Sequence, residues 1–147
     1  WEMRNYEIYS IKKEIAYYFY RREQKIYQLF KEYQETEGIQ REIFAKQIDY
    51  ITEPIPAIAI HQQLIRHLQT RRDFKIHNEH YIIENKRGKA LLKMFERKLT
   101  LQVSGVMDID MLFLDILTYV DGYFLAIDLN QERFGWVKLV KENTVNI

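Results

Sequence analysis

The four histidines, His61, His67, His77 and His80, are the first candidates for catalysis or metal binding in this sequence. A zinc pair on a helix needs histidines at positions i and i+4, whereas His61 and His67 are six apart and do not share a helical face. His77 and His80 can meet only across a turn. The chain has no Cys, so disulfides, thiolate zinc sites and Cys nucleophiles are excluded. We expect no metal site and interpret the histidines as solvent-facing or edge residues.

The remaining polar residues form no catalytic motif. Ser10 and Ser104 lie in no nucleophile motif, and the scattered glycines form neither a P-loop nor a G-x-G-x-x-G sequence. Asp108, Asp110 and Asp115 resemble a carboxylate cluster, but Asp108 suits a helix N-cap and Asp115 a solvent-facing position on the same helix. We therefore expect no catalytic residues, no cofactor and no enzymatic activity.

Charge composition argues against general nucleic-acid binding. The chain has 22 Lys and Arg against 21 Asp and Glu, a net charge of +1, which is not the electrostatic footprint of a DNA or RNA binder. The neighbours of its clustered basic residues are acidic or polar rather than aromatic, which favours a solvated edge. A regulator acting directly on DNA or RNA remains the alternative. The clusters are Arg66, His67, Arg71, Arg72 and Lys75, and Lys86, Arg87, Lys89 and Lys93.

Length and hydropathy indicate a soluble protein of one domain, residues 1–147. No run of apolar residues is long enough to cross a bilayer, and the start, Trp1-Glu2-Met3, has no signal-peptide pattern. The absence of Cys fits a reducing compartment, and we expect the protein to act in the cytoplasm without contacting a membrane.

The segment from Lys12 to Glu35 organises the predicted fold. It contains no Gly or Pro, and its apolar residues recur at helical spacing, which predicts one long helix. Arg22 interrupts the apolar stripe, and aromatic rings surround the first half of the segment. We predict that the second half packs on the core and that the first half leaves apolar surface for a partner. The stripe consists of Ile15, Phe19, Ile26, Leu29, Phe30 and Tyr33.

The other elements predict an α+β or mixed α/β fold, with a mixed or antiparallel sheet packed with about four helices. Gly38 is predicted to end the long helix, and Gln47 and Tyr50 lie one turn apart on an exposed face of the next helix. The predicted helices are Ile39–Thr52, Ala57–Leu68 and a segment from Asp108 to Val120. The predicted strands are Arg4–Ile11, His80–Asn85, Lys89–Phe95, Arg97–Val103, Tyr123–Leu129 and Arg133–Val140.

Three segments together resemble the SirA family, the sporulation inhibitors of replication of endospore-forming bacteria. The resemblance spans nearly the whole chain, is weak between Thr70 and Leu101, and includes no catalytic signature. The first segment runs from Ile11 through Phe19 to Tyr33; the second is KQIDYITEPIP, residues 46–56, with His61-Gln62; the third runs from FLAIDLN, residues 124–130, through RFGW, residues 133–136, to Glu142.

This resemblance implies a non-enzymatic regulator that binds the N-terminal domain of the replication initiator DnaA and holds back new rounds of replication. The family's partner-contacting positions fall on Ile15, Phe19, Gln47 and Tyr50 in this sequence. The first two are aromatic in the family, whereas here Ile15 is aliphatic and Phe19 lacks a hydroxyl. Core packing is the alternative role for Ile15 and Phe19. The sequence leaves the oligomeric state open.

Overall fold

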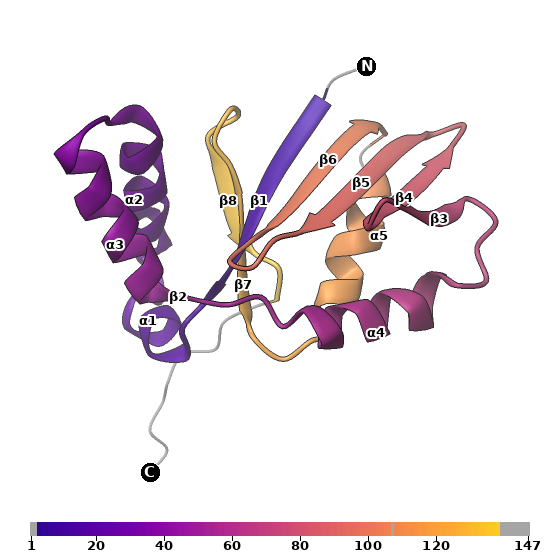
Figure 1. Cartoon of the computed structure of the whole chain (residues 1–147), viewed down its shortest axis with the longest axis horizontal. Helices are drawn as coiled ribbons and strands as arrows, with labels where there is room; N and C mark the ends of the chain where they lie inside the picture. Colours follow the sequence, from indigo (N-terminus) through magenta and orange to yellow (C-terminus); the bar gives the residue numbers. More distant parts are fainter. Residues whose placement is uncertain (1–2, 107, 139–147) are drawn as a thin grey trace, which may run out of the picture.

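The computed structural model describes residues 3–106 and 108–138 (Figure 1). Its helices are α1 (Lys13–Tyr18), α2 (Glu23–Glu35), α3 (Ile39–Ile51), α4 (Ala57–Leu68) and α5 (Asp108–Leu117). Its strands are β1 (Met3–Ile11), β2 (Thr52–Glu53), β3 (Phe74–His77), β4 (His80–Asn85), β5 (Gly88–Met94), β6 (Leu99–Gly105), β7 (Tyr123–Asp128) and β8 (Arg133–Trp136).

The strands form one antiparallel sheet in the order β3-β4-β5-β6-β1-β7-β8, and β2 pairs with the end of β1. The prediction of an α+β fold is confirmed, and of the two predicted sheet types the antiparallel one is observed. β1 lies inside the sheet, where Ile8 pairs with Leu99 of β6 on one side and Ala126 of β7 on the other. The strand that leads into the helical segment is therefore anchored on both edges.

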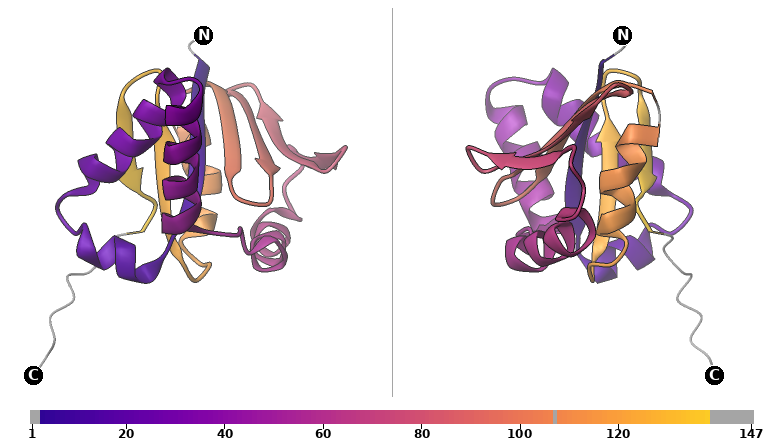
Figure 2. Two further views of the ribbon diagram at one scale, coloured as in Figure 1. Left: turned by 60° about the vertical axis from the view of Figure 1, so that its left-hand side comes forward. Right: turned by 90° about the vertical axis from the view of Figure 1, so that its right-hand side faces the viewer.

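Hydrophobic residues pack on both faces of the sheet. Successive residues of a strand point to opposite faces, so Ile8 of β1 joins a core with α4 and α5, while Tyr9 and Ile11 join a second core with α1, α2 and α3. Figure 2 shows α5 on one side of the sheet and α2 and α3 on the other. Burying each large apolar side chain stabilises the fold by about 1.5 to 3 kcal/mol.

The predicted long helix is two helices joined by a corner. α1 ends at Tyr18, α2 begins at Glu23, and Arg21 between them has a positive φ of 68°. The prediction of one helix from Lys12 to Glu35 is therefore wrong, and the helix count is five rather than about four for the described residues. The break moves Arg22 out of the apolar stripe into solvent, where its guanidinium lies 5.5 Å from the centre of the Phe19 ring.

Packing on two separate strands explains the corner. α1 packs at the end of β7, where the hydroxyls of Tyr17 and Tyr123 lie 3.0 Å apart. α2 packs toward β8, where the Tyr27 ring stacks on Phe134 with 4.9 Å between centroids. A straight helix over residues 12–35 would be about 35 Å long and could not pack against both β7 and β8 in this way. No Gly or Pro marks the corner, so the sequence carries no ordinary signal for it.

Several further elements differ from the predictions. Gly38 does not end α2, whose C-cap is Thr36; it precedes α3 with a φ of 72°, a conformation that glycine adopts without strain. β3 was not predicted, because its exposed residues at the sheet edge lack a buried alternating pattern. α5 ends at Leu117 rather than Val120, and β8 ends at Trp136, while residues 139–140 of the predicted strand lie outside the described residues.

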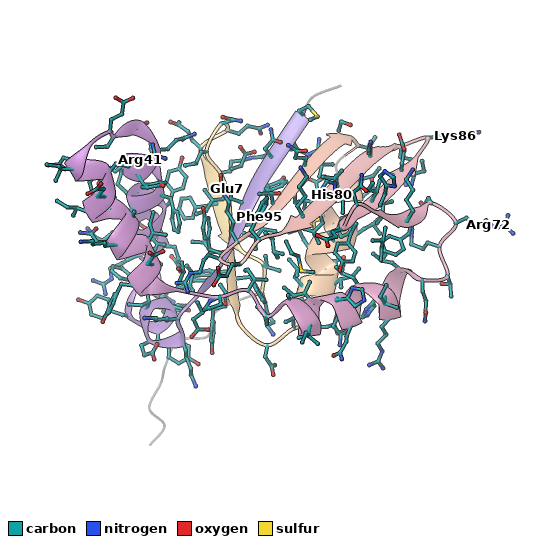
Figure 3. All side chains as sticks on the ribbon, viewed as in Figure 1. Glu7, Arg41, Arg72, His80, Lys86 and Phe95 are labelled. Carbon is teal, nitrogen blue, oxygen red and sulfur yellow. The ribbon has the colours of Figure 1, made fainter. Side chains whose placement is uncertain are left out.

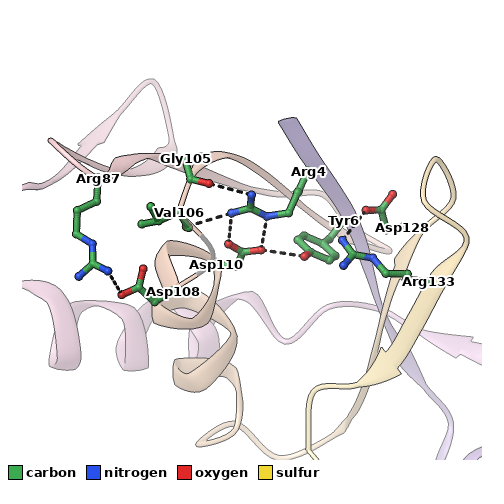
Figure 4. A network of polar contacts seen from close by, with 9 residues as sticks. All are labelled: Arg4, Tyr6, Arg87, Gly105, Val106, Asp108, Asp110, Asp128 and Arg133. Carbon is green, nitrogen blue, oxygen red and sulfur yellow. Dashed lines mark hydrogen bonds and ion pairs between the residues drawn. The ribbon is translucent and has the colours of Figure 1, made fainter. Parts of the chain in front are cut away.

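A buried ion pair fastens β1 to α5 (Figure 4). Arg4 donates from Nε to Asp110 Oδ2 at 2.8 Å and from Nη2 to Oδ1 at 2.5 Å, and both side chains are almost completely buried. Tyr6 adds a hydrogen bond from its hydroxyl to Asp110 at 2.8 Å. Burial raises the pKa of Asp110, but the hydrogen bonds from Arg4 and Tyr6 outweigh burial, and the net pKa lies below its usual value. Asp110 is thus a structural carboxylate.

Candidate functional site

A groove of about 510 Å³ runs between α2 and α3. The two helices pack side by side at one end of the molecule, beyond β8 (Figures 1 and 2). The groove opens to solvent and mixes apolar with polar residues. It is lined by Phe19, Lys25, Ile26, Gln28, Leu29, Glu32, Lys46, Gln47, Tyr50 and Ile51.

The floor of the groove is apolar and its rim is polar. Ile26 and Ile51 are buried, and Leu29 is half-buried, so these three side chains belong both to the second core and to the groove. Lys25 and Lys46 on the rim are exposed. An apolar floor with a few polar groups around it is the usual composition of a protein-binding surface.

The structure brings together three of the four predicted site residues. Phe19, Gln47 and Tyr50 all line the groove, although Phe19 comes from the end of α1 and the other two come from α3. Ile15 does not line it: this residue lies one turn before Phe19 in α1, is half-buried and packs against the second core. The prediction of an exposed face on α3 is confirmed, since Gln47 and Tyr50 are both exposed.

Phe19 combines the two roles that were predicted as alternatives. It is half-buried, packs against the second core and also lines the groove. Its backbone N–H donates to the carbonyl of Ile15 at 3.0 Å, and its ring meets the Tyr18 ring edge-on with 4.9 Å between centroids. The corner after α1 therefore holds the Phe19 ring at one end of the groove.

Tyr50 is the most exposed aromatic residue of the groove. Tyr50 is 68% exposed, so most of its surface is available to a partner. The ammonium of Lys12 lies 4.5 Å from the centre of its ring. This cation–π contact orients the ring at the end of α3 without covering it.

Several groove residues were missed in the sequence. The periodicity of α2 predicts only core positions for Ile26 and Leu29, and it predicts no role for Lys25, Gln28 and Glu32. The spacing of Lys25, Gln28 and Glu32 does indicate a common helix face, because these three residues follow one another at intervals of three and four along the apolar stripe of α2. Which partner helix they face depends on how α2 packs against α3, and the sequence of α2 alone does not contain that information.

Residues that could do chemistry are otherwise engaged or separated. His61 Nδ1 lies 2.6 Å from the hydroxyl of Tyr81, whose pKa is raised by burial. Within residues 3–106 and 108–138, no group of three or more His, Asp and Glu side chains converges in a geometry that could hold a metal ion. No helix in the described part of the chain is both long and apolar enough to cross a membrane.

Two members of the basic clusters are paired with carboxylates. Arg71 forms a two-point contact with Asp73, at 2.9 and 2.8 Å, and its hydrogen bond lowers the pKa of Asp73. Arg87 pairs with Asp108 at 2.5 Å, where Asp108 is the first residue of α5. These pairs reduce the positive potential that a nucleic-acid backbone would require.

Comparison with known proteins identifies the family. Residues 4–141 match the family model described as "Sporulation inhibitor of replication protein SirA", so the match includes both helices of the groove. A Bacillus subtilis (strain 168) protein of the same name is 36% identical over 143 residues, which cover 95% of this chain and 96% of that protein. The chain therefore belongs to the SirA family of sporulation inhibitors of replication.

Proposed function

We propose that this protein inhibits the initiation of DNA replication during sporulation by binding the N-terminal domain of DnaA in the groove between α2 and α3. The name of its Bacillus subtilis relative, a sporulation inhibitor of replication, supports the biological role. One structural observation supports the choice of this surface. The groove is lined by Phe19, Gln47 and Tyr50, three of the four residues for which the family resemblance implies partner contact. The protein acts by binding alone and catalyses no reaction.

The groove contains the kinds of residue that supply most of the binding free energy in a protein interface. Its apolar floor is partly solvated in the free protein, so a partner that covers Leu29 and Phe19 gains from burying apolar surface. Tyr50 adds a large ring whose hydroxyl stays able to bond to the partner or to water. An interface of ordinary size buries about 1,200 to 2,000 Å² in total, of which this groove forms the central part.

Ile15 belongs to the margin of this surface in our proposal. It lies one turn before Phe19 on α1 and is half-buried, so its exposed part extends the contact beside Phe19. The bound protein would inhibit the assembly of DnaA at the origin, because a DnaA domain that it covers is not free to take part in that assembly.

Calorimetric titration of the purified protein with the N-terminal domain of DnaA tests the proposal. Central aromatic residues of an interface cost on the order of 2 kcal/mol or more when truncated, which corresponds to a roughly 30-fold weaker Kd. We expect Phe19→Ala and Tyr50→Ala each to weaken binding by at least this factor. Tyr50→Ala is the cleaner variant, because its exposed side chain contributes little to folding.

Tyr119→Ala is the matched control, since Tyr119 is a comparably exposed aromatic residue that lies outside the groove. It should bind like the wild type. Thermal unfolding of each variant separates loss of binding from loss of folding. Wild-type affinity in the folded Tyr50→Ala variant, or no binding by the wild type, contradicts the proposal.

A further inference from the structure

Cations surround one end of the groove. Lys25 and Lys46 line it, Lys12 lies over the Tyr50 ring at 4.5 Å, and Arg22 lies over the Phe19 ring at 5.5 Å. The Phe19–Tyr50 end, which holds the two proposed anchors, is therefore flanked by four positive charges. Among the residues that line the groove, Glu32 is the one carboxylate.

These four cations take part in none of the ion pairs formed within the described residues. Six ion pairs occur there, and their basic members are Arg4, Lys31, Arg71, Arg87, Lys98 and Arg133. The carboxylate next to Tyr50 in the chain, Asp49, is displaced by about 100° around α3 because successive helical residues turn by that angle. The Glu23 carboxylate beside Arg22 accepts hydrogen bonds from the Arg21 N–H and from Trp136 Nε1, and it forms no ion pair with any of the four cations.

This local charge stands out against the balance of the whole protein. The chain carries a net charge of only +1, so the four cations near this groove are not explained by a generally basic surface. Arg22, Lys25 and Lys46 are exposed, and Lys12 is half-exposed. Exposed charges act over about 8 Å at physiological salt, a reach that includes a partner approaching the groove.

We propose that the surface recognised by the groove is acidic: carboxylates of the partner ring an apolar centre and face Lys12, Arg22, Lys25 and Lys46. This inference rests on the proposed function, because it names the chemistry of the DnaA surface that the groove takes. The positive end steers an acidic surface toward the groove and raises the association rate, while Phe19 and Tyr50 hold it once it is bound. It also disfavours basic surfaces of similar shape.

Association kinetics measured by surface plasmon resonance with the N-terminal domain of DnaA test this inference. For the wild type we expect the association rate constant to fall by roughly tenfold between about 0.05 M and 0.5 M NaCl. The double variant Lys25→Glu/Lys46→Glu should associate at least about tenfold more slowly at low salt and lose most of its salt dependence, with little change in the dissociation rate.

The double variant Lys86→Glu/Lys89→Glu is the matched control, since it makes the same change in net charge away from the groove. Lys86 lies at the opposite end of the molecule from the α2–α3 turn, where Arg41 is found (Figure 3). The control should keep at least most of the wild-type rate. An association rate that does not respond to salt, or an equal loss in both double variants, overturns the acidic-surface inference while leaving Tyr50-dependent binding intact. Absence of binding by the wild type overturns the proposed function itself and the inference with it.

Discussion

Phe19 and Tyr50 line the same groove, although Phe19 is the C-cap of α1 and Tyr50 lies near the end of α3. Their convergence depends on the corner at Arg21, which turns the chain between α1 and α2. α2 then packs against α3, and its residues Ile26 and Leu29 line the same groove as the two rings. The sequence separation of the two residues hides this relationship, and the packing of three helices creates it.

Gln47 contributes a polar contact at the groove in our account. It is exposed in the free protein, so Gln47→Ala removes no internal support, and we expect thermal unfolding to be unchanged. Loss of one neutral hydrogen bond to the partner should weaken binding by about 0.5 to 1.5 kcal/mol, or roughly two- to tenfold in Kd. Calorimetric titration measures this change.

Gln62→Ala is the control for Gln47, because Gln62 is an exposed glutamine on α4 and lies outside the groove. It should leave the Kd unchanged. An equal effect of the two substitutions would show that Gln47 makes no contact of its own.

The positive φ of Arg21 stores backbone strain at the corner between α1 and α2. A non-glycine residue in this region costs on the order of 1 kcal/mol, and glycine adopts the conformation without a Cβ clash. We therefore expect Arg21→Gly to raise the free energy of unfolding by up to about 1 kcal/mol in urea titrations, after the entropy of the unfolded chain is included. Arg21→Ala keeps the strain and should bring no such gain.

The ion pair between Arg4 and Asp110 predicts a specific dependence of stability on pH. The folded-state pKa of Asp110 lies below its unfolded value of about 3.9, so the pair stabilises the fold at pH values above that and the stabilisation is lost as pH falls through the folded-state pKa. Asp110→Asn should flatten the decline in unfolding free energy between neutral pH and about pH 3. A decline as steep as that of the wild type would contradict this role.

Removing one member of this buried pair leaves the other charge unpaired. We expect Asp110→Ala to lower the free energy of unfolding by about 3 to 5 kcal/mol. Asp73→Ala breaks the more exposed pair with Arg71 and should cost only about 1 kcal/mol or less. Urea titrations at neutral pH compare the two variants directly.

Tyr27 buries its hydroxyl without a hydrogen-bond partner among the described residues. Burial also raises the pKa of this hydroxyl. Tyr27→Phe removes the unsatisfied group and keeps the ring stacked on Phe134, so we expect an unfolding free energy higher by about 1 kcal/mol. In contrast, Tyr17→Phe removes the hydroxyl contact with Tyr123 and should lower the free energy of unfolding by about 1 kcal/mol.

Local patterns predicted most elements because each element carries its own periodicity. The helices at α3 and α4 and the strands at β1, β4 and β7 follow from alternation, helical spacing and the prolines between Thr52 and Ala57. The corner at Arg21 could not be predicted, since it results from two helices packing on different strands. β3 is equally invisible in the sequence, because an exposed edge strand of four residues needs its neighbour β4 to form.

The candidate site was predictable in part for the same reason. The exposure of Gln47 and Tyr50 follows from their position on one helix, and the surplus of aromatic rings near Phe19 indicated a surface. Asp110 illustrates the opposite case: its ion pair with Arg4 joins residues that are 106 positions apart in the sequence, and no local pattern predicts it. The positions of Lys12 and Lys46 are not predictable from local patterns either. Only the folded structure places Lys12 over the Tyr50 ring and Lys46 at the groove.

Methyl-resolved NMR of the isotope-labelled protein tests the central claim most directly, because it reports where the partner sits. On addition of unlabelled N-terminal domain of DnaA, we predict shifts for the methyl groups of Ile26, Leu29 and Ile51, which line the groove. The methyl groups of Leu64 and Leu101 in the opposite core should stay unchanged. Binding that leaves the groove methyl groups unshifted would contradict the account.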